Sequence, residues 1–423
     1  MTIAIIIGLL FVLFFLRVPI AFSILAVSLL YVFALSTLPP TVGIQRMISG
    51  VDSFVLLALP LFVLAGNLMN SGGMTRRMVN AALAYVGHVR GGLAQTNIGA
   101  SVLMSGVSGS AVADASALGS MMIPAMRRAG YSREYSSALT ASSAVIGPLV
   151  PPSIPMVVIA TAASLGVGDM FLAGAVPGLL VAVALAVATF FLSRRYAWPV
   201  EPRTRFPELV KRTVVAAPAL LAPAIIVVGI VGGIFTPTEA GAAVCVYALV
   251  IGALLYRQFG RNIWSVFVES ASASVSVLFI IAAAAAFGYV LTVEQVPLHL
   301  VELLEPLYAT PWLFLLLINV VLLVLGAFME GLAVIILLTP VLMPAVMAAG
   351  IDPIHFATIV VFNLMIGTIT PPLGVVMYIT NRIAGVTVGQ FIKANAPYFL
   401  VLGIMLALVT YVPAVSTWLP SLF

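Results

Sequence analysis

The sequence predicts an all-helical protein that crosses a membrane many times, and three observations lead to this prediction. Of the 423 residues, 63% are hydrophobic and 7% are charged, whereas soluble globular domains carry about 25% charged residues. The apolar residues form long runs and not the short alternating segments of a transmembrane β-barrel. A single cysteine allows neither an internal disulfide nor a thiolate metal site. A soluble enzyme, a disordered chain and a nucleic-acid-binding protein are therefore excluded.

Apolar runs separated by charges, prolines or glycines mark the predicted membrane segments. Ten are single crossings, near residues 2–16, 18–36, 54–70, 134–164, 170–193, 213–232, 238–256, 265–292, 356–381 and 394–414. The runs 94–126 and 312–349 exceed the roughly 20 residues that one crossing needs, and polar or glycine-containing stretches interrupt them midway. We interpret each of these two runs as a re-entrant helical hairpin.

The positions of the charged residues support this topology. One set of loops carries Arg17, Arg76, Arg77, Arg90, Arg127, Arg128, Arg133, the basic residues of 194–212, Arg257, Arg261, Arg382 and Lys393. The alternate loops carry Asp52, Asp169, Glu239, Glu294, Glu302, Glu305 and Asp352, with Arg46 as their only basic residue. With two hairpins, every loop of the first set is cytoplasmic and both termini lie outside, as the positive-inside rule expects. The first run lacks a preceding basic region, so we interpret it as a retained crossing and not a signal peptide.

The chain contains an internal repeat with an offset of 220 residues. This offset aligns Pro124 with Pro344, the pair at 151–152 with the pair at 371–372, and Pro177 with Pro397. Five crossings separate equivalent points, so the second copy is inverted in the membrane. Inverted repeats with broken helices are typical of secondary transporters, which bind solute near the midplane between the copies. The alternative is that helix-breaking proline pairs recur by chance.

The first hairpin has a polar tip at residues 105–116, with four serines, two glycines and Asp114. Non-helical backbone at membrane depth is tolerated only where protein buries it or where it lines a cavity. Its carbonyl and hydroxyl oxygens suit Na⁺, and N–H groups at the start of a half-helix suit an anion. Asp114 is a functional candidate, although it can instead cap the following helix or pair with a basic residue.

Two later crossings contain paired prolines that are expected to break them, in the segments 142–153 and 363–372. Proline removes a helical N–H and drives the preceding residue out of the helical region. The freed carbonyls are further candidate ligands, and we expect each break to face a hairpin tip. A simple proline kink is the alternative.

The second hairpin tip, residues 326–331, contains one acid, Glu330, between glycines 326 and 331. This carboxylate is predicted either to take part in cation binding or protonation, or to accept a hydrogen bond from a backbone amide.

The remaining sequence motifs do not indicate a further function. Gly166-Val-Gly-Asp169 matches an intramembrane aspartyl protease signature, but no second suitably placed aspartate follows, and we interpret Asp169 as a helix cap. Walker A, H-E-x-x-H and G-x-S-x-G sequences are absent, so no catalytic residue, cofactor or transition metal is expected. The segment 70–92 is partly amphipathic and is predicted to lie at the cytoplasmic interface.

Several motifs together resemble one transporter family. They are Arg17-Val-Pro-Ile-Ala-Phe22, Ser108-Gly-Ser-Ala-Val-Ala-Asp114, Ile123-Pro124, Ala129-Gly130-Tyr131, Pro151-Pro-Ser-Ile154, Ala173-Gly-Ala-Val-Pro177-Gly178 and the segment 363–372. They are similar to the large membrane subunit of tripartite ATP-independent periplasmic (TRAP) transporters, over nearly the whole chain. The resemblance implies a multi-pass protein of the bacterial inner membrane and Na⁺-driven symport by an elevator mechanism. A periplasmic binding protein would deliver a small carboxylate, and a small subunit of about four helices, here expected as a separate chain, would brace the scaffold.

The resemblance also implies domains and sites. Scaffold helices would occupy 1–70 and 194–292, a connecting arm 71–92, the two transport-domain repeats 93–193 and 312–423, and a periplasmic connector 293–311. One Na⁺ site would comprise Ser105, Ser108, Ser110, Ser143 and Gly147, and the other Gly326, Glu330, Asn363, Gly367, Thr368 and Thr370. Substrate contacts would involve Ser108, Ser110, Asp114, Pro152, Ser153, Thr370 and Pro372. Two alternatives remain open: a stand-alone carboxylate/Na⁺ transporter, and an intramembrane enzyme or energy-transducing subunit.

Overall fold

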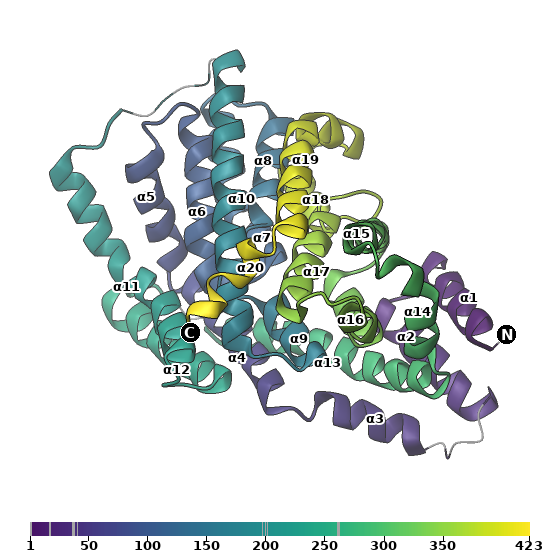
Figure 1. Ribbon diagram of the computed structural model, residues 1–423. Coiled ribbons are helices and arrows are strands. Elements are labelled where there is room, and N and C mark those ends of the chain that lie inside the picture. The colour runs from purple at the N-terminus through teal and green to yellow at the C-terminus, as the bar shows by residue number, and fades with distance from the viewer. Residues whose placement is uncertain are drawn as a thin grey trace.

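The computed structural model describes residues 2–16, 18–35, 39, 41–196, 198, 200, 202–259 and 263–423, and every regular element in these ranges is a helix (Figure 1). Arg17 and Arg261, two of the basic residues predicted to be cytoplasmic, lie outside the described residues. Within the described part, eight helical segments are long and apolar enough to cross a membrane, and four shorter apolar helices accompany them. The predicted all-helical membrane fold is confirmed.

The N-terminal helices are α1 (Thr2–Phe15), α2 (Ile20–Leu30), the π-turn η1 (Tyr31–Leu35), α3 (Thr41–Val51), the 3-10 turn η2 (Phe54–Leu57) and α4 (Ala58–Ser71). The sequence did not predict α3, which is amphipathic and too short for a crossing. It packs against α13 (Ile263–Val293). A Cβ on Gly50 would lie 2.2 Å from the Cβ of Ala285, so glycine permits this close approach.

The first repeat begins after the arm helix α5 (Met74–Val86). It contains α6 (Gly92–Ser108), α7 (Ala111–Arg128), α8 (Arg133–Ala144), α9 (Ile154–Ala163) and α10 (Val167–Tyr196). Helices α6 and α7 form the predicted hairpin, and the segment between α8 and α9 is the predicted break. Serine side chains cap the N-termini of α8 and α9. The hydroxyl oxygens of Ser132 and Ser153 accept hydrogen bonds from the backbone amides of Tyr135 and Met156.

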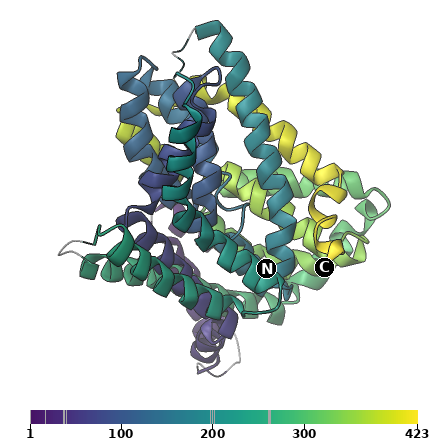
Figure 2. The same cartoon turned by 90° about the vertical axis from the view of Figure 1, so that its left-hand side faces the viewer.

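The central part of the chain forms helices at the periphery of the molecule (Figures 1 and 2). They are α11 (Phe206–Val231), α12 (Pro237–Val250), the π-turn η3 (Ile251–Leu255), α13, α14 (Val296–Leu304) and the 3-10 turn η4 (Glu305–Leu307). Thr236 and Glu239 form a complete capping box at the start of α12. The segment 293–311, expected as a periplasmic connector, contains α14.

The second repeat contains α15 (Pro311–Phe328), α16 (Gly331–Ala348), α17 (Pro353–Gly367), α18 (Val375–Ala384), α19 (Val388–Tyr411), α20 (Ala414–Thr417) and the turn η5 (Pro420–Leu422). Its elements follow the order of the first repeat: hairpin, broken helix, long helix. The bounds of α7 shifted by 220 residues coincide with those of α16, and the bounds of α6 coincide with those of α15 to within one residue. Both arms of this second hairpin, α15 and α16, are long enough to cross a membrane.

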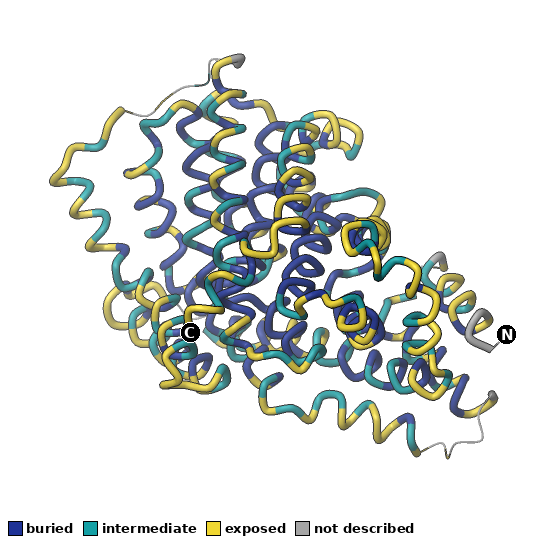
Figure 3. The backbone as a smooth tube through the Cα atoms, viewed as in Figure 1, coloured by how far each residue is buried: buried dark blue, intermediate teal, exposed yellow. Residues whose placement is uncertain are grey.

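Buried polar side chains join the two repeats. The hydroxyls of Tyr135 in α8 and Tyr398 in α19 lie 2.6 Å apart, and the Ser142 hydroxyl donates to Oδ1 of Asn395 at 2.7 Å. Helix α8 packs against both α18 and α19, and nearly all residues of α8 and α17 are buried (Figure 3). The two repeats therefore form one packed unit, with the core at their centre.

Candidate functional site

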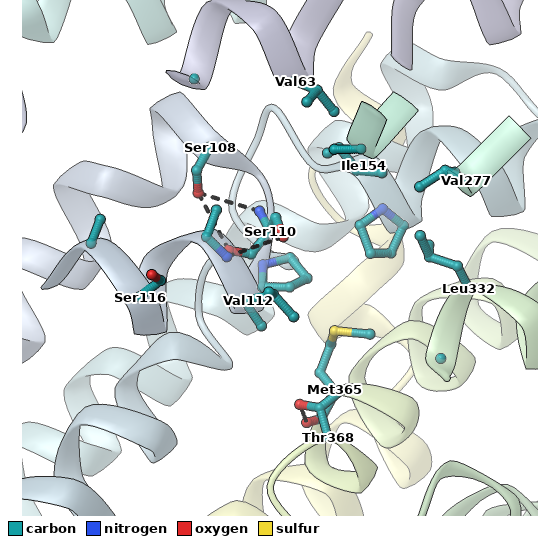
Figure 4. Close-up of a pocket in the computed structure, with 18 of the residues that line it drawn as sticks. Val63, Ser108, Ser110, Val112, Ser116, Ile154, Val277, Leu332, Met365 and Thr368 are labelled. Atoms are coloured by element: carbon teal, nitrogen blue, oxygen red, sulfur yellow. Dashed lines mark hydrogen bonds between the residues drawn. The ribbon is translucent and has the colours of Figure 1, made fainter. Parts of the chain in front are cut away.

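A cavity of about 380 Å³ lies where the two hairpin tips meet the two helix breaks. Figure 4 shows Ser108 and Ser110 of the first tip on one side of it and Met365 and Thr368 of the second break on another. Glu330 of the second tip also lines it. Helices α4 and α13 complete the wall, with Asn67 among the residues from α4. The structure therefore brings both tips and both breaks to one space.

The first tip rests directly on the first break. Gly109, between α6 and α7, has a φ of 57°, a left-handed conformation that favours glycine. A Cβ there would lie 2.2 Å from the carbonyl oxygen of Pro152. The amide of Ile154 donates to the Gly109 carbonyl at 3.2 Å. These contacts explain why only glycine fits this position.

Asp114 lies in the first turn of α7 and is fully buried. Its Oδ1 accepts a hydrogen bond from the Ser108 hydroxyl at 2.5 Å, and its Oδ2 has no hydrogen-bond partner among the described residues. Oδ2 faces Gly147 of the break, where a Cβ would lie 2.4 Å away. Neither sequence alternative describes this arrangement: Ser110 caps α7, and no ion pair joins Asp114 to a basic side chain in the described part.

The second tip uses its acid as a helix cap. Glu330 precedes α16, and its Oε2 accepts a hydrogen bond from the amide of Ala333 at 3.1 Å. Of the two predicted roles, the structure shows the hydrogen bond to a backbone amide, while the residue also lines the cavity. A Cβ on Gly367 would lie 2.6 Å from the carbonyl carbon of Gly326, so α15 and the end of α17 touch through glycine.

The predicted first Na⁺ group is close together but only partly at the cavity. Ser108 and Ser110 line the cavity, whereas Ser105, Ser143 and Gly147 do not. The Ser105 hydroxyl donates to the Val102 carbonyl at 2.6 Å, and the Ser143 hydroxyl donates to the Thr140 carbonyl at 3.2 Å. Pro152 and Ser153 stand behind the tip, and Ser153 caps α9 while donating to the Pro148 carbonyl. The hydroxyl oxygens of Ser105, Ser143 and Ser153 and the carbonyl oxygens of the break are the candidate cation ligands on this side of the cavity.

The second group has the same layout. Glu330 and Thr368 line the cavity, whereas Gly326, Asn363, Gly367, Thr370 and Pro372 do not. The hydroxyls of Thr368 and Thr370 donate to the carbonyls of Met365 and Ile366 at 2.6 and 2.8 Å. The amide of Leu373, beside Pro372, donates to the Ala327 carbonyl at 3.0 Å and so ties this break to the second tip.

Asn363 belongs to a buried polar network that the sequence did not reveal. Its Nδ2 donates to Oδ1 of Asn319 at 2.7 Å, and Nδ2 of Asn319 donates to the hydroxyl of Thr410 at 3.0 Å. Oδ1 of Asn363 has no hydrogen-bond partner among the described residues. The available signal was Asn319 itself, an isolated amide in an otherwise apolar hairpin arm. Asn67, which lines the cavity from α4, was missed for a similar reason.

Three helices direct their N-termini at the cavity. The first residues of α7, α9 and α16, namely Ala111, Ile154 and Gly331, all line it. Helix N-termini carry partial positive charge and several N–H groups without helical partners. The side chains of Ser110, Ser153 and Glu330 each accept a hydrogen bond from one of these groups, and the remaining ones are available. No basic side chain is among the described lining residues. The arrangement therefore favours an anionic group held by main-chain dipoles. Asp169 lies in the first turn of α10, exposed and outside this lining.

The repeat, the paired tips and breaks and the central cavity define a membrane permease. Solved transporters share the fold. The YdaH transporter of Alcanivorax borkumensis has a TM-score of 0.62 at 18% identity over 90% of this chain and 89% of its own. MtrF of Neisseria gonorrhoeae has a TM-score of 0.56 at 14% identity over 88% of this chain and 82% of its own. These likenesses concern the fold alone.

Sequence relatives are more specific. The large permease protein SiaM of the sialic acid TRAP transporter of Vibrio cholerae is 40% identical over 97% of this chain and 96% of its own. The large permease protein DctM of the C4-dicarboxylate TRAP transporter of Pseudomonas aeruginosa is 41% identical over 88% of this chain and 87% of its own. Residues 7–415 match the family described as the tripartite ATP-independent periplasmic transporter, DctM component.

The chain belongs to this family of TRAP transporter large permeases. It is a multi-pass protein of the bacterial inner membrane and a transporter subunit, not an enzyme. Its family serves secondary solute uptake with a binding protein.

Proposed function

We propose that this permease takes up a small carboxylate by Na⁺ symport, after a periplasmic binding protein delivers the solute. The observation that carries this proposal is the cavity between the two tips, where three helix N-termini converge without a basic side chain. Main-chain N–H groups at such termini bind carboxylates. Relatives are named for sialic acid, C4-dicarboxylate and 2,3-diketo-L-gulonate, which are carboxylates, and one is named for isethionate, a sulfonate.

Two Na⁺ ions are proposed, one at each contact between a tip and a break. Each contact contains one buried side-chain oxygen without a hydrogen-bond partner in the described part, Oδ2 of Asp114 in the first and Oδ1 of Asn363 in the second. A buried unpaired oxygen is costly, and a cation would compensate it. Nearby carbonyls and hydroxyls are hard ligands that suit Na⁺ better than a transition metal.

An elevator movement is proposed because the two repeats form one packed unit that touches the remaining helices through small residues. A Cβ on Gly66 of α4 would lie 3.3 Å from Cα of Ser108 at the first tip. A Cβ on Gly106 of α6 would lie 2.6 Å from the ring of Pro223 in α11. Small residues and proline rings give smooth surfaces across which one body can slide. In this proposal, helices α1–α4 and α11–α13 form the scaffold, braced by a separate small subunit of about four helices.

Reconstituted uptake tests the proposal. Proteoliposomes would contain the permease with its small membrane subunit, and uptake of a radiolabelled carboxylate would be measured with and without an inward Na⁺ gradient and with and without binding protein. We expect uptake only when both are present. Uptake that persists without Na⁺ contradicts the coupling, and uptake without binding protein favours the stand-alone transporter.

Substitutions at the tips and breaks test the Na⁺ sites. Ser110→Ala and Thr370→Ala each remove a hydroxyl from one site, and we expect the Na⁺ concentration for half-maximal uptake to rise about tenfold, the equivalent of roughly 1.4 kcal/mol. Ser120→Ala is the matched control, because that serine is exposed and bonds only within its own helix. Unchanged Na⁺ dependence in both site variants, with normal membrane insertion, contradicts the assignment.

A further inference from the structure

A basic hollow lies between the arm helix α5 and the first turns of α11, apart from the central cavity. It consists of two adjoining spaces of about 410 and 290 Å³ that share Leu83, Glu208 and Arg212. Five basic side chains and one carboxylate are among its described lining: Arg77, Arg203, Arg205, Lys211, Arg212 and Glu208. Helices α5 and α11 pack against each other here, as Figure 1 shows at the edge of the molecule.

Only part of this positive charge is neutralised within the protein. Nε of Arg212 donates to Oε1 of Glu208 at 2.9 Å. The Arg77 guanidinium lies 3.6 Å from the ring centroid of Tyr256, and its Nη1 donates to the Gly73 carbonyl at 2.8 Å, so its charge is positioned but not cancelled. Lys211 is exposed and forms no ion pair with any described residue. The hollow therefore favours an anion.

The walls are fixed by contacts across the two helices. The Tyr85 hydroxyl in α5 lies 2.8 Å from the hydroxyl of Thr213 in α11. The Tyr256 hydroxyl donates a hydrogen bond to the Val215 carbonyl of α11 at 2.8 Å. The ring of the same tyrosine packs against the Arg77 guanidinium. The basic side chains therefore line a space whose walls are held in place by contacts between helices.

An apolar stripe runs along the exposed face of α11. Phe206, Val210, Val214, Leu221 and Val228 are spaced four or seven residues apart, and between 41% and 75% of each is exposed. Residues at these spacings share one helical face. In a membrane protein such a face contacts lipid chains. By helical periodicity this face points away from the side of α11 that carries Glu208, Arg212 and Val215 of the hollow. The positive-inside rule places the loop near residues 203–212 on the cytoplasmic side.

We propose that this hollow binds the phosphate headgroup of an anionic phospholipid of the cytoplasmic leaflet. Basic pockets between helices on the cytoplasmic side are suited to such headgroups, whose surface attracts Lys and Arg. The lipid would lie against both the arm and α11. A free phosphate shares the headgroup chemistry but lacks the acyl chains that hold a lipid in the leaflet.

Native mass spectrometry tests the proposal on the full chain, together with any membrane subunit that co-purifies. Dioleoylphosphatidylglycerol, dioleoylphosphatidylcholine and inorganic phosphate would each be titrated, and the affinity of the first bound molecule measured. The test variant Arg205→Gln/Lys211→Gln removes one charge from each part of the hollow. We expect phosphatidylglycerol affinity to fall about thirtyfold, since each basic residue contributes roughly fivefold near an anionic lipid.

Arg127→Gln/Arg128→Gln is the matched control, because it removes two exposed cytoplasmic charges that do not line the hollow. The control is expected to bind phosphatidylglycerol within threefold of the unmodified protein. Equal weakening in both double variants would overturn the proposal in favour of general surface attraction. Equal affinity for phosphatidylcholine, or phosphate binding as tight as lipid binding, would overturn it as well. Normal thermal unfolding of the test variant shows that a lost affinity does not reflect misfolding.

Discussion

At the scale of single residues, Asp114 combines burial with an incomplete set of hydrogen bonds. One carboxylate oxygen accepts the Ser108 hydroxyl, and the other faces the backbone of Gly147 without a hydrogen-bond partner in the described part. The sequence singled out Asp114 because it is an acid in an apolar, hairpin-like run. It could not show the second oxygen facing Gly147, because the two residues belong to segments that meet only after the tip folds onto the break.

Asp114→Asn tests the role of this carboxylate. The amide has nearly the same shape but no charge, so we expect the Na⁺ concentration for half-maximal uptake to rise at least about tenfold, or roughly 1.4 kcal/mol, because a cation would lose a charged ligand. Asp169→Asn is the control, since Asp169 is exposed in the first turn of α10. Equal Na⁺ dependence in both variants would argue against a cation beside Asp114.

At the scale of elements, the sequence predicted the hairpins, the breaks and the amphipathic arm helix α5, but not the short helices α3 and α14. The runs 94–126 and 312–349 correspond to α6–α7 and α15–α16, which span 92–128 and 311–348. Long apolar runs and proline pairs are strong local signals. Helices α3 and α14 have 11 and 9 residues and no long apolar run, so their formation depends on packing against larger helices such as α13 and α16.

The contact between α15 and the end of α17 yields a stability prediction. Gly367→Ala would place a methyl group 2.6 Å from the backbone of Gly326, and such overpacking costs about 1–3 kcal/mol. We expect a lower midpoint of thermal unfolding in detergent, followed by intrinsic fluorescence.

Gly389→Ala provides the comparison, since a methyl group there meets no atom within 4 Å and alanine favours helix by about 1 kcal/mol. That variant should unfold at the same temperature or higher. Equal midpoints for the two variants would mean that the helices separate at little cost, and that glycine is not required for their contact.

At the scale of the whole molecule, the sequence did not predict how the two repeats pack against the peripheral helices. The repeat offset and the positive-inside pattern predict the order and sides of the segments. They contain no information on which peripheral helix meets which tip. The structure supplies this information: α4 contacts the first tip at Gly66 and Ser108, and α11 contacts α6 at Pro223 and Gly106.

A reversible cross-link tests whether these bodies move relative to each other. The Cβ positions of residues 66 and 108 are 3.9 Å apart, within the span of a disulfide of roughly 3.5–4.5 Å. In a Cys245→Ser background, Gly66→Cys/Ser108→Cys should form a disulfide on oxidation. We expect the oxidised protein to lose uptake and a reductant to restore it to the level before oxidation. Undiminished uptake by the fully cross-linked protein would exclude sliding between α4 and the first tip.

The convergence of three helix N-termini on the cavity has a consequence for how such permeases diversify. Every residue except proline has a peptide N–H group, so most substitutions leave an anion site made from such groups in place. The apolar residues beside it, such as Val63, Val277 and Met365, can vary and reshape the rest of the cavity. If the cavity binds a carboxylate as proposed, one backbone can keep that contact while the rest of the solute changes from a short diacid to a bulky sugar acid.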